Sequence, residues 1–286
     1  MSETAVIGLC LIGGSLALAV GARGFDSDES VRVAARERGI AVADSLAEAV
    51  RGARLVVVAV PVAQTPAVLR AAAGEGDAVL TDVASVKRPL LAALAELPDG
   101  TRVVGGHPMA GSTARGIAAA DASLFRDRTW LLVPTARSDA AAMALVGDLA
   151  RAAGARPLVV SAERHDQLMT WVSHLPLAVA SALARSARRH GGKGIEEAGG
   201  PGFVDTTRLA RTPRELALEL ALADPDALAR AIDALRDELG ELADVLRSGA
   251  REALGAFLDE AAAARAQLDP APTRPPSHST EFPEPP

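Results

Sequence analysis

The segment from Thr4 to Val20 limits most strongly what this chain can fold into. A short apolar run, Thr4–Ile7, leads into the sequence GLCLIGGSL at residues 8–16, and an Ala- and Leu-rich run then continues to Val20. A strand that turns through glycines into a helix is typical of the opening of a dinucleotide-binding βαβ unit. The chain is therefore expected to begin with an α/β domain.

The rest of the first half repeats this alternation of short apolar runs and helical stretches. Predicted strands are Thr4–Ile7, a strand ending near Gly24-Phe25-Asp26, Leu55–Val60, Ala78–Thr81, Arg102–Gly105, Trp130–Pro134 and Arg156–Val160. Predicted helices are Leu11–Val20, Ser30–Arg38, Leu46–Val50, Thr65–Ala73, Lys87–Glu96 and Ser138–Ala153. Strands that are apolar on both faces belong in a buried parallel sheet between two layers of helices. Residues 1–162 are thus predicted to form a Rossmann-like, doubly wound α/β domain with a parallel sheet.

The second half, residues 163–268, is predicted to be an all-helical domain, because no convincing strand follows Val160. Glu163–Arg189 reads as one long helix, and Asp224 caps a later helix that has Pro225 at its first position. That helix carries an apolar stripe, Leu228, Ile232, Leu235, Leu239, Leu242 and Val245. The stripe is either an ordinary core face or a dimer seam. Seven of the 17 residues from Pro270 to Pro286 are proline, so the tail 269–286 is predicted to be disordered.

Composition excludes several classes of protein. A net charge of -6 gives no electrostatic footprint for nucleic acid. The single cysteine excludes an internal disulfide and a multi-cysteine metal site, no metal is expected, and a reducing, cytoplasmic location fits best. The uncharged run Ala5–Ala22 is interrupted by glycines and has no basic residue before it, so no membrane role is expected.

The glycine loop is predicted to bind the cofactor. Gly8 supplies the tight turn and Gly13 the close packing, while the helix N-terminus at Leu11 and Ile12 offers N–H groups to a pyrophosphate. An acidic residue at the end of the second strand, Asp26, binds ribose hydroxyls and favours NAD over NADP. Val60 and Pro61, at the end of a predicted strand, are assigned to the same cofactor site.

One residue of this loop argues against tight cofactor binding. Cys10 replaces the middle glycine of the fingerprint and is itself assigned to the cofactor site, where its side chain can crowd the phosphate or block the required backbone angles. The segment from Gly8 to Asp26 is also short, which leaves little room for the first helix and the second strand. A family member with weakened NAD binding therefore stays open as an alternative.

Five motifs, in this order, resemble the prephenate/arogenate dehydrogenase family of tyrosine biosynthesis. They are GLCLIGGSL at residues 8–16, TDVASVK at 81–87, GGHPMAGS at 105–112, HD at 165–166 with SHLP at 173–176, and GGPGFVDTTRLA at 199–210. The resemblance spans about Thr4 to Leu268 and implies a Rossmann domain followed by an all-helical dimerisation domain. It further implies a homodimer that converts prephenate, a small molecule, to 4-hydroxyphenylpyruvate and carbon dioxide with hydride transfer to NAD.

The resemblance also assigns catalytic roles. His107, at the carboxyl edge of the sheet, is implied to be the base that accepts the hydroxyl proton, although a loop histidine taken alone is more often structural. Ser85 is implied to bond the substrate hydroxyl and the nicotinamide side, or alternatively to cap the helix that starts near Lys87. Lys87 itself is read as a solvated or phosphate-facing charge.

Substrate-binding roles follow from the helical half. Arg208 is implied to bind a carboxylate of prephenate, and His174 the side chain or the second carboxylate. Asp205 can orient Arg208. Asp166 is read as complementing the helix dipole, and His165 as structural or as part of a domain interface.

Three alternatives remain open from the sequence. Residues 112–115 offer no acidic partner for the ammonium of arogenate, which favours prephenate, but arogenate and 4-amino-4-deoxyprephenate stay possible. A catalytically impaired relative that only binds ligands is the second alternative. A different hydroxyacid dehydrogenase or imine reductase with the same two-domain plan is the third, and it leaves the GGHPMAGS and SHLP motifs unexplained.

Overall fold

The computed structural model describes residues 3–111 and 114–268. The expectations for Ser112 and for the tail 269–286 lie outside these residues. The described chain forms two compact units, which meet in the sequence between Ala223 and Asp224. These units do not coincide with the domains predicted from the sequence, whose boundary at residue 162 stays a prediction.

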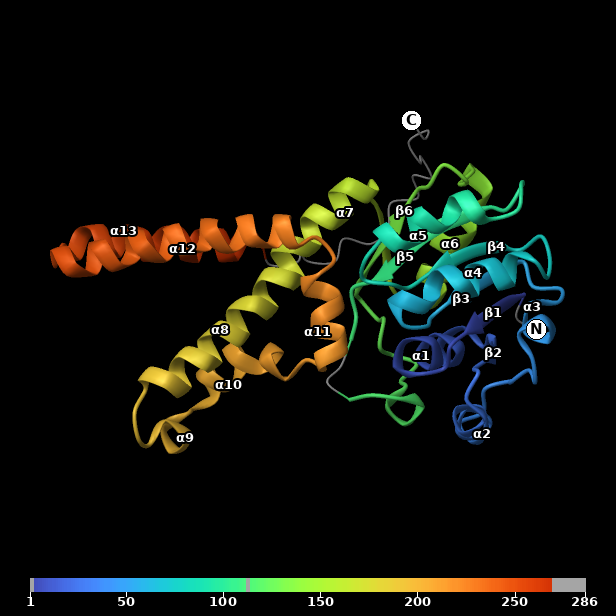
Figure 1. Ribbon diagram of the computed structural model, residues 1–286, viewed down its shortest axis with the longest axis horizontal. Coiled ribbons are helices and arrows are strands. Elements are labelled where there is room, and N and C mark those ends of the chain that lie inside the picture. The colour runs from blue at the N-terminus through green and yellow to red at the C-terminus, as the bar shows by residue number, and fades with distance from the viewer. Residues whose placement is uncertain (1–2, 112–113, 269–286) are drawn as a thin grey trace. The chain divides into compact units, whose positions relative to one another are not determined.

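A seven-stranded sheet forms the centre of the first unit (Figure 1). Its strands are β1 (Thr4–Ile7), β2 (Arg23–Phe25), β3 (Leu55–Val58), β4 (Val79–Asp82), β5 (Val103–Pro108), β6 (Thr129–Val133) and β7 (Arg156–Val159). Their order in the sheet is β2-β1-β3-β4-β5-β6-β7. β2 and β3 flank β1 on opposite sides, so β1 and β3 form the topological switch point of the sheet. Ligands bind beside the carboxyl ends of the strands at such a point.

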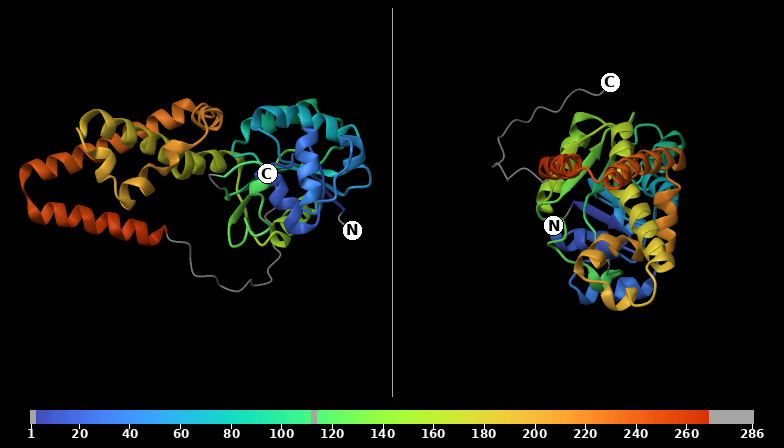
Figure 2. Two further views of the ribbon diagram at one scale, coloured as in Figure 1. Left: turned by 90° about the horizontal axis from the view of Figure 1, so that it is seen from below. Right: turned by 90° about the vertical axis from the view of Figure 1, so that its left-hand side faces the viewer.

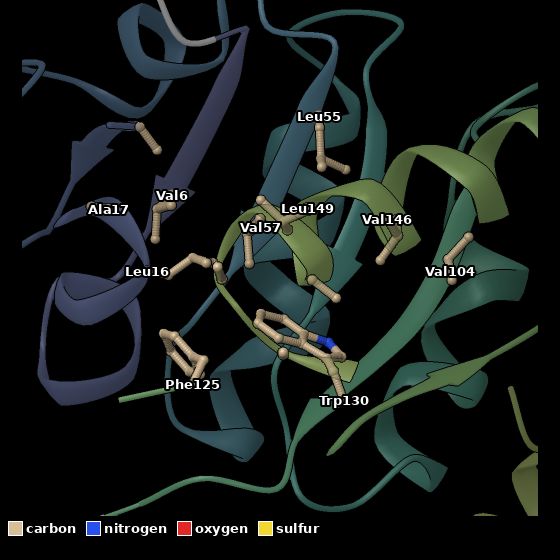
Figure 3. Close-up of a cluster of buried hydrophobic side chains, with 14 of the residues drawn as sticks. Val6, Leu16, Ala17, Leu55, Val57, Val104, Phe125, Trp130, Val146 and Leu149 are labelled. Atoms are coloured by element: carbon tan, nitrogen blue, oxygen red, sulfur yellow. The ribbon is translucent and has the colours of Figure 1, made fainter. Parts of the chain in front are cut away.

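Helices cover both faces of the sheet, as predicted for a doubly wound domain. They are α1 (Leu11–Val20), α2 (Glu29–Glu37), α3 (Leu46–Val50), α4 (Thr65–Ala73), α5 (Arg88–Ala93) and α6 (Ala140–Ala152). Alternate strand residues point into two separate cores. Val6 and Val57 pack with α1 and α6, whereas Ile7 and Val58 pack with α3, α4 and α5. Figure 3 shows Trp130 and Phe125 in the first of these cores.

The sheet is mostly parallel, as predicted, with one antiparallel pair that was not predicted. β1 to β5 pair in parallel with their neighbours, but β6 runs antiparallel to β5, with His107 opposite Leu131. A parallel return needs a crossover, usually a helix. Between β5 and β6 the described residues contain the 3₁₀ turn Ile117–Ala119 and no α-helix, so the chain returns in the opposite direction.

The remainder of the first unit is helical, and no strand follows β7 in the part of the chain that the structure describes. Its elements are α7 (Ala162–Met169), a π-helical turn (Thr170–His174), α8 (Leu175–His190), α9 (Ile195–Ala198), α10 (Pro201–Thr207), a 3₁₀ turn (Arg208–Arg211) and α11 (Arg214–Ala221). The long helix predicted over Glu163–Arg189 is thus interrupted by a π turn. Pro176 explains the interruption, because proline has no N–H to donate to the preceding turn.

The second unit consists of α12 (Pro225–Ser248) and α13 (Arg251–Gln267). The predicted start of α12 is confirmed: the Asp224 side chain accepts a hydrogen bond from the Ala227 N–H at 2.9 Å, and Pro225 is the first helical residue. The two helices are joined at Gly249 and diverge from this turn (Figure 2, left). Among the described residues, no helix is long and apolar enough to span a membrane.

Candidate active site

The glycine loop lies at the carboxyl end of β1, beside the end of β3. Gly8 has a φ of 96°, and a Cβ at this position would stand 2.5 Å from the carbonyl oxygen of Ala59. A Cβ at Gly13 would stand 1.8 Å from the carbonyl oxygen of Gly8. Both positions therefore require glycine. Val60 lies against the loop, with its Cγ1 3.0 Å from the Cβ position of Gly8, and Pro61 follows it on the exposed side.

Asp26 holds this loop in place. One carboxylate oxygen accepts a hydrogen bond from the N–H of Leu9 at 2.8 Å, and the other accepts one from the N–H of Asp28 at 3.0 Å. α1 begins at Leu11, and no described side chain caps its N-terminus. The first N–H groups of α1, including those of Leu11 and Ile12, are consequently directed toward the space where a phosphate can bind.

Cys10 does not strain the loop. Its φ of -69° is ordinary for any L-residue, so the anticipated conflict with the backbone angles does not arise. Its side chain is exposed. The pKa of the Cys10 thiol is raised, mainly by partial burial and to a smaller extent by the negative charges of Asp26 and Asp28.

A fully buried ion pair lies where β4 and β5 end. Lys87 Nζ is 2.6 Å from a carboxylate oxygen of Asp82, and neither side chain is exposed. Lys87 also donates to the carbonyl oxygen of Gly106 at 2.6 Å, and Asp82 accepts from the N–H of Gly106 at 2.9 Å. The reading of Lys87 as a solvated or phosphate-facing charge is therefore wrong. The pair ties the loop after β4 to the residue that precedes His107.

Ser85 lies in the same loop, between Asp82 and Lys87, and is half-buried. It does not cap the following helix, because α5 begins at Arg88 with Lys87 at the capping position and no side-chain cap. The alternative role as a helix cap is therefore excluded, and its hydroxyl makes no hydrogen bond within the part of the chain that the structure describes.

His107 is buried near the carboxyl end of β5. Its Nδ1 is 2.9 Å from Nε2 of His165, which comes from α7. Nδ1 of His165 is in turn 2.9 Å from a carboxylate oxygen of Asp166. His165 is fully buried, whereas the Asp166 side chain is 33% exposed. The three side chains thus form a chain of hydrogen bonds that leads from the edge of the sheet to solvent.

The electrostatic surroundings keep His107 uncharged. Burial, and then the positive charge of Lys87, lower the pKa of His107 well below its usual value of 6.5. His174, in the π turn, acts on His107 in the same direction. Burial lowers the pKa of His174 as well, although Asp166 opposes this shift. The Nε2 of His174 is buried without a hydrogen-bond partner among the described residues.

Arg208 and Asp205 are both exposed, and no ion pair joins them within the described residues. The expected orientation of Arg208 by Asp205 is therefore not seen, whereas the substrate-binding role of Arg208 stays a prediction. Arg208 begins the 3₁₀ turn that packs against α8, and it makes no described hydrogen bond. The structure therefore groups His107, His165, His174 and Lys87, but it does not fix Arg208 by protein contacts.

The roles of Asp82, Lys87, His165 and Asp166 do not follow from the sequence analysis, although all four lie in the motifs that resemble the family. A usable signal existed for the first two, because an aspartate and a lysine five positions apart directly after an apolar strand can pair beneath the sheet edge. For His165 the signal was the adjacent aspartate, since a carboxylate beside a histidine often orients the ring.

Two family models match the chain. The nucleotide-binding domain of prephenate dehydrogenase matches residues 18–159, and the dimerization domain of prephenate dehydrogenase matches residues 161–260. The first match begins after the glycine loop, so the loop is supported by its geometry rather than by this match.

Individual relatives agree with the family models. The prephenate dehydrogenase of Bacillus subtilis is 33% identical over 80% of this chain, which spans 66% of that relative. The cyclohexadienyl dehydrogenase of Zymomonas mobilis is 32% identical over 85% of this chain and 88% of that relative. The crystal structure of A. aeolicus prephenate dehydrogenase with hydroxyphenyl propionate and NAD+ has a TM-score of 0.84 at 27% identity, covering 94% of this chain and 99% of that one. The chain therefore belongs to the prephenate dehydrogenase family.

Proposed function

We propose that this protein oxidises prephenate, with NAD as hydride acceptor, and releases carbon dioxide and 4-hydroxyphenylpyruvate. The observation that carries the proposal is a buried, uncharged imidazole, His107, at the carboxyl edge of the sheet of a prephenate dehydrogenase family member. A neutral base is what removal of a hydroxyl proton requires at this place.

The residues present fit a dinucleotide. A Cβ at Gly8 or Gly13 would fill the turn, and the uncapped N-terminus of α1 offers N–H groups to a pyrophosphate. Asp26, whose carboxylate already receives two backbone N–H groups, has lone pairs left for ribose hydroxyls. NAD, when bound, supplies the acceptor for the hydride that leaves the carbinol carbon.

The protein's own groups act on the substrate. His107 accepts the hydroxyl proton, and Ser85, whose hydroxyl is free of described partners, bonds the same oxygen. The unpaired Nε2 of His174 and the exposed guanidinium of Arg208 bind the two carboxylates of prephenate. Burial of His107 and His174 excludes water from the reacting hydroxyl.

We also propose that the working form is a homodimer built through the helical half of the chain. The match of residues 161–260 to a dimerization domain supports this proposal. Large apolar side chains of α12 are exposed, namely Ile232, Leu239 and Leu246, and a second copy of the chain can cover them.

The direct test mixes purified protein with prephenate and NAD and follows NADH absorbance and carbon dioxide release. His107→Asn should lower kcat at least a hundredfold, because general-base catalysis contributes about 10²–10⁴-fold. Affinity for NAD, measured by calorimetry, should stay unchanged, because His107 lies on β5 and the glycine loop follows β1.

The pH profile gives a second readout. His107 must be neutral to act, and its pKa is lowered below 6.5, so kcat/KM for prephenate should stay constant down to about pH 6.5 and fall only at lower pH. Arogenate and 4-amino-4-deoxyprephenate are assayed in parallel. Absence of prephenate turnover, or full activity of His107→Asn, would contradict the proposal, and turnover of an analogue alone would identify the analogue as the substrate.

A further inference from the structure

We propose that His165 and Asp166 are positioning residues for His107, and that they fix the ring tautomer that leaves its Nε2 as a proton acceptor. The inference rests on the proposed function, because it concerns the base of that reaction. It stands on the hydrogen-bond chain from Asp166 through His165 to His107, with 2.9 Å at each step.

The chemistry of the chain fixes where its protons lie. An ionised carboxylate only accepts hydrogen bonds, so Nδ1 of His165 must carry the hydrogen that faces Asp166. A neutral His165 then presents Nε2 as an acceptor. Nδ1 of His107 must therefore donate to it, and a neutral His107 is left with an unprotonated Nε2. That nitrogen is the one able to accept a hydroxyl proton.

The opposite arrangement is disfavoured by charge. If His165 donated from Nε2 as well as from Nδ1, it would be a cation, and its ring is fully buried. The titratable and charged groups that act on His107 are Lys87, beneath the sheet edge, His174, in the π turn, and His165 itself. Lys87 adds positive charge to this cluster, and its partner Asp82 is already engaged.

Histidine tautomers can be read directly by ¹⁵N NMR of the purified full chain, independently of turnover. The sequence contains five histidines, which makes assignment by single substitutions practical. We expect His107 of the unaltered protein at pH 7.5 to be protonated at Nδ1 and unprotonated at Nε2. In His165→Leu this preference should be lost, because the acceptor for Nδ1–H is removed.

A conservative variant separates positioning from simple packing. In His165→Gln the amide oxygen can accept the Nδ1–H of His107, so the tautomer and most of kcat should be retained, within about threefold of the unaltered enzyme. His165→Leu should lower kcat for prephenate at least tenfold and leave KM within threefold. The kcat of Asp166→Asn should lie between those of His165→Gln and His165→Leu, because the introduced amide oxygen can still accept a hydrogen bond from His165.

His190→Gln serves as the matched control, because His190 is exposed at the end of α8. It should change neither the tautomer of His107 nor the kinetics, and thermal unfolding shows whether each variant is folded. An unaltered protein protonated at Nε2 of His107 would overturn the inference, as would unchanged kcat in a folded His165→Leu. Absence of turnover with prephenate would instead defeat the proposed function, and the tautomer would still be read from the NMR spectra.

Discussion

At the scale of single residues, the site depends on charges that lie beneath it. Lys87 and Asp82 are both fully buried, and together they bind both backbone polar groups of Gly106, directly before His107. A Cβ on Gly106 would stand 2.5 Å from the carbonyl oxygen of Asp82, so this position requires glycine. The base is consequently held by a rigid support rather than by a free loop.

Loss of Lys87 should therefore destabilise the fold. Lys87→Met leaves Asp82 as an uncompensated buried charge, which costs about 3–5 kcal/mol of unfolding free energy. Adding Asp82→Asn to Lys87→Met should recover part of this loss, because the stranded charge is removed. Urea unfolding followed by circular dichroism measures both.

The control for this comparison is the exposed ion pair between Arg54 and Glu3. Arg54→Met should cost no more than about 1 kcal/mol, as is usual for surface pairs. Equal losses of unfolding free energy in Arg54→Met and Lys87→Met would show that the buried ion pair stabilises the fold no more than a surface pair does.

The sequence predicts which residues belong to the site better than it predicts what surrounds them. His107 was found because it follows an apolar strand within a specific motif. Its partner His165 lies 58 positions away, and its tautomer depends on that contact, which no local pattern reveals. Lys87 was misread because a lysine is rarely buried, whereas this one is paired with Asp82 and donates to the carbonyl oxygen of Gly106.

At the scale of elements, strand–turn–helix patterns were the most predictable part of the chain. α1 spans the predicted Leu11–Val20, because Gly8 turns the chain after β1, the Ala- and Leu-rich residues favour a helix, and Gly21 ends it in the left-handed conformation. The direction of β6 and the π turn at Thr170–His174 were not predicted. The direction of β6 depends on the absence of a crossover helix among the described residues before it, and the π turn depends on the N–H that Pro176 lacks. The periodicity of apolar residues reports neither feature.

The loop between β1 and α1 gives a prediction at this scale. Asp26→Asn replaces one of two acceptors by an NH₂ group that faces a backbone N–H, either at Leu9 or at Asp28. We expect the Kd for NAD to rise about tenfold, which corresponds to about 1.4 kcal/mol. The preference for NAD over NADP should narrow, because the negative charge that repels a 2′-phosphate is lost.

Calorimetry with both cofactors measures these changes. Asp28→Asn is the control, because asparagine caps a helix as well as aspartate does and Asp28 caps α2. Its cofactor affinities should match those of the unaltered protein. If Asp26→Asn bound NAD as tightly as that protein, the assignment of Asp26 to the cofactor site would be refuted.

At the scale of the whole molecule, α12 and α13 have little apolar core of their own. Of the predicted α12 stripe, Leu228 is buried and Leu235, Leu242 and Val245 are half-buried. Ile232 and Leu239 are 43% and 57% exposed. The stripe is therefore not an ordinary core face along its whole length, and its exposed residues are the ones that a dimer seam would cover.

Association should fail when this exposed surface is made polar. Leu239→Glu places a charge in the middle of the apolar stripe, and we expect the dimer Kd to rise at least a hundredfold, about 2.7 kcal/mol. Sedimentation equilibrium over a range of concentrations measures it. Glu241→Lys, exposed two positions along the same helix, should leave the dimer unchanged, and a dimer that survives Leu239→Glu would place the interface elsewhere.

The hydrogen bond between His107 and His165 joins the two family modules, since one residue lies within 18–159 and the other within 161–260. Modules of this kind are natural units for gene shuffling and for engineered chimaeras. Here the junction passes between an imidazole and the group that sets where its hydrogen lies. A hybrid that takes its first module from one parent and its second from another therefore takes His107 and the residue that sets its tautomer from different parents. Compatible parents thus need to preserve this pair of histidines.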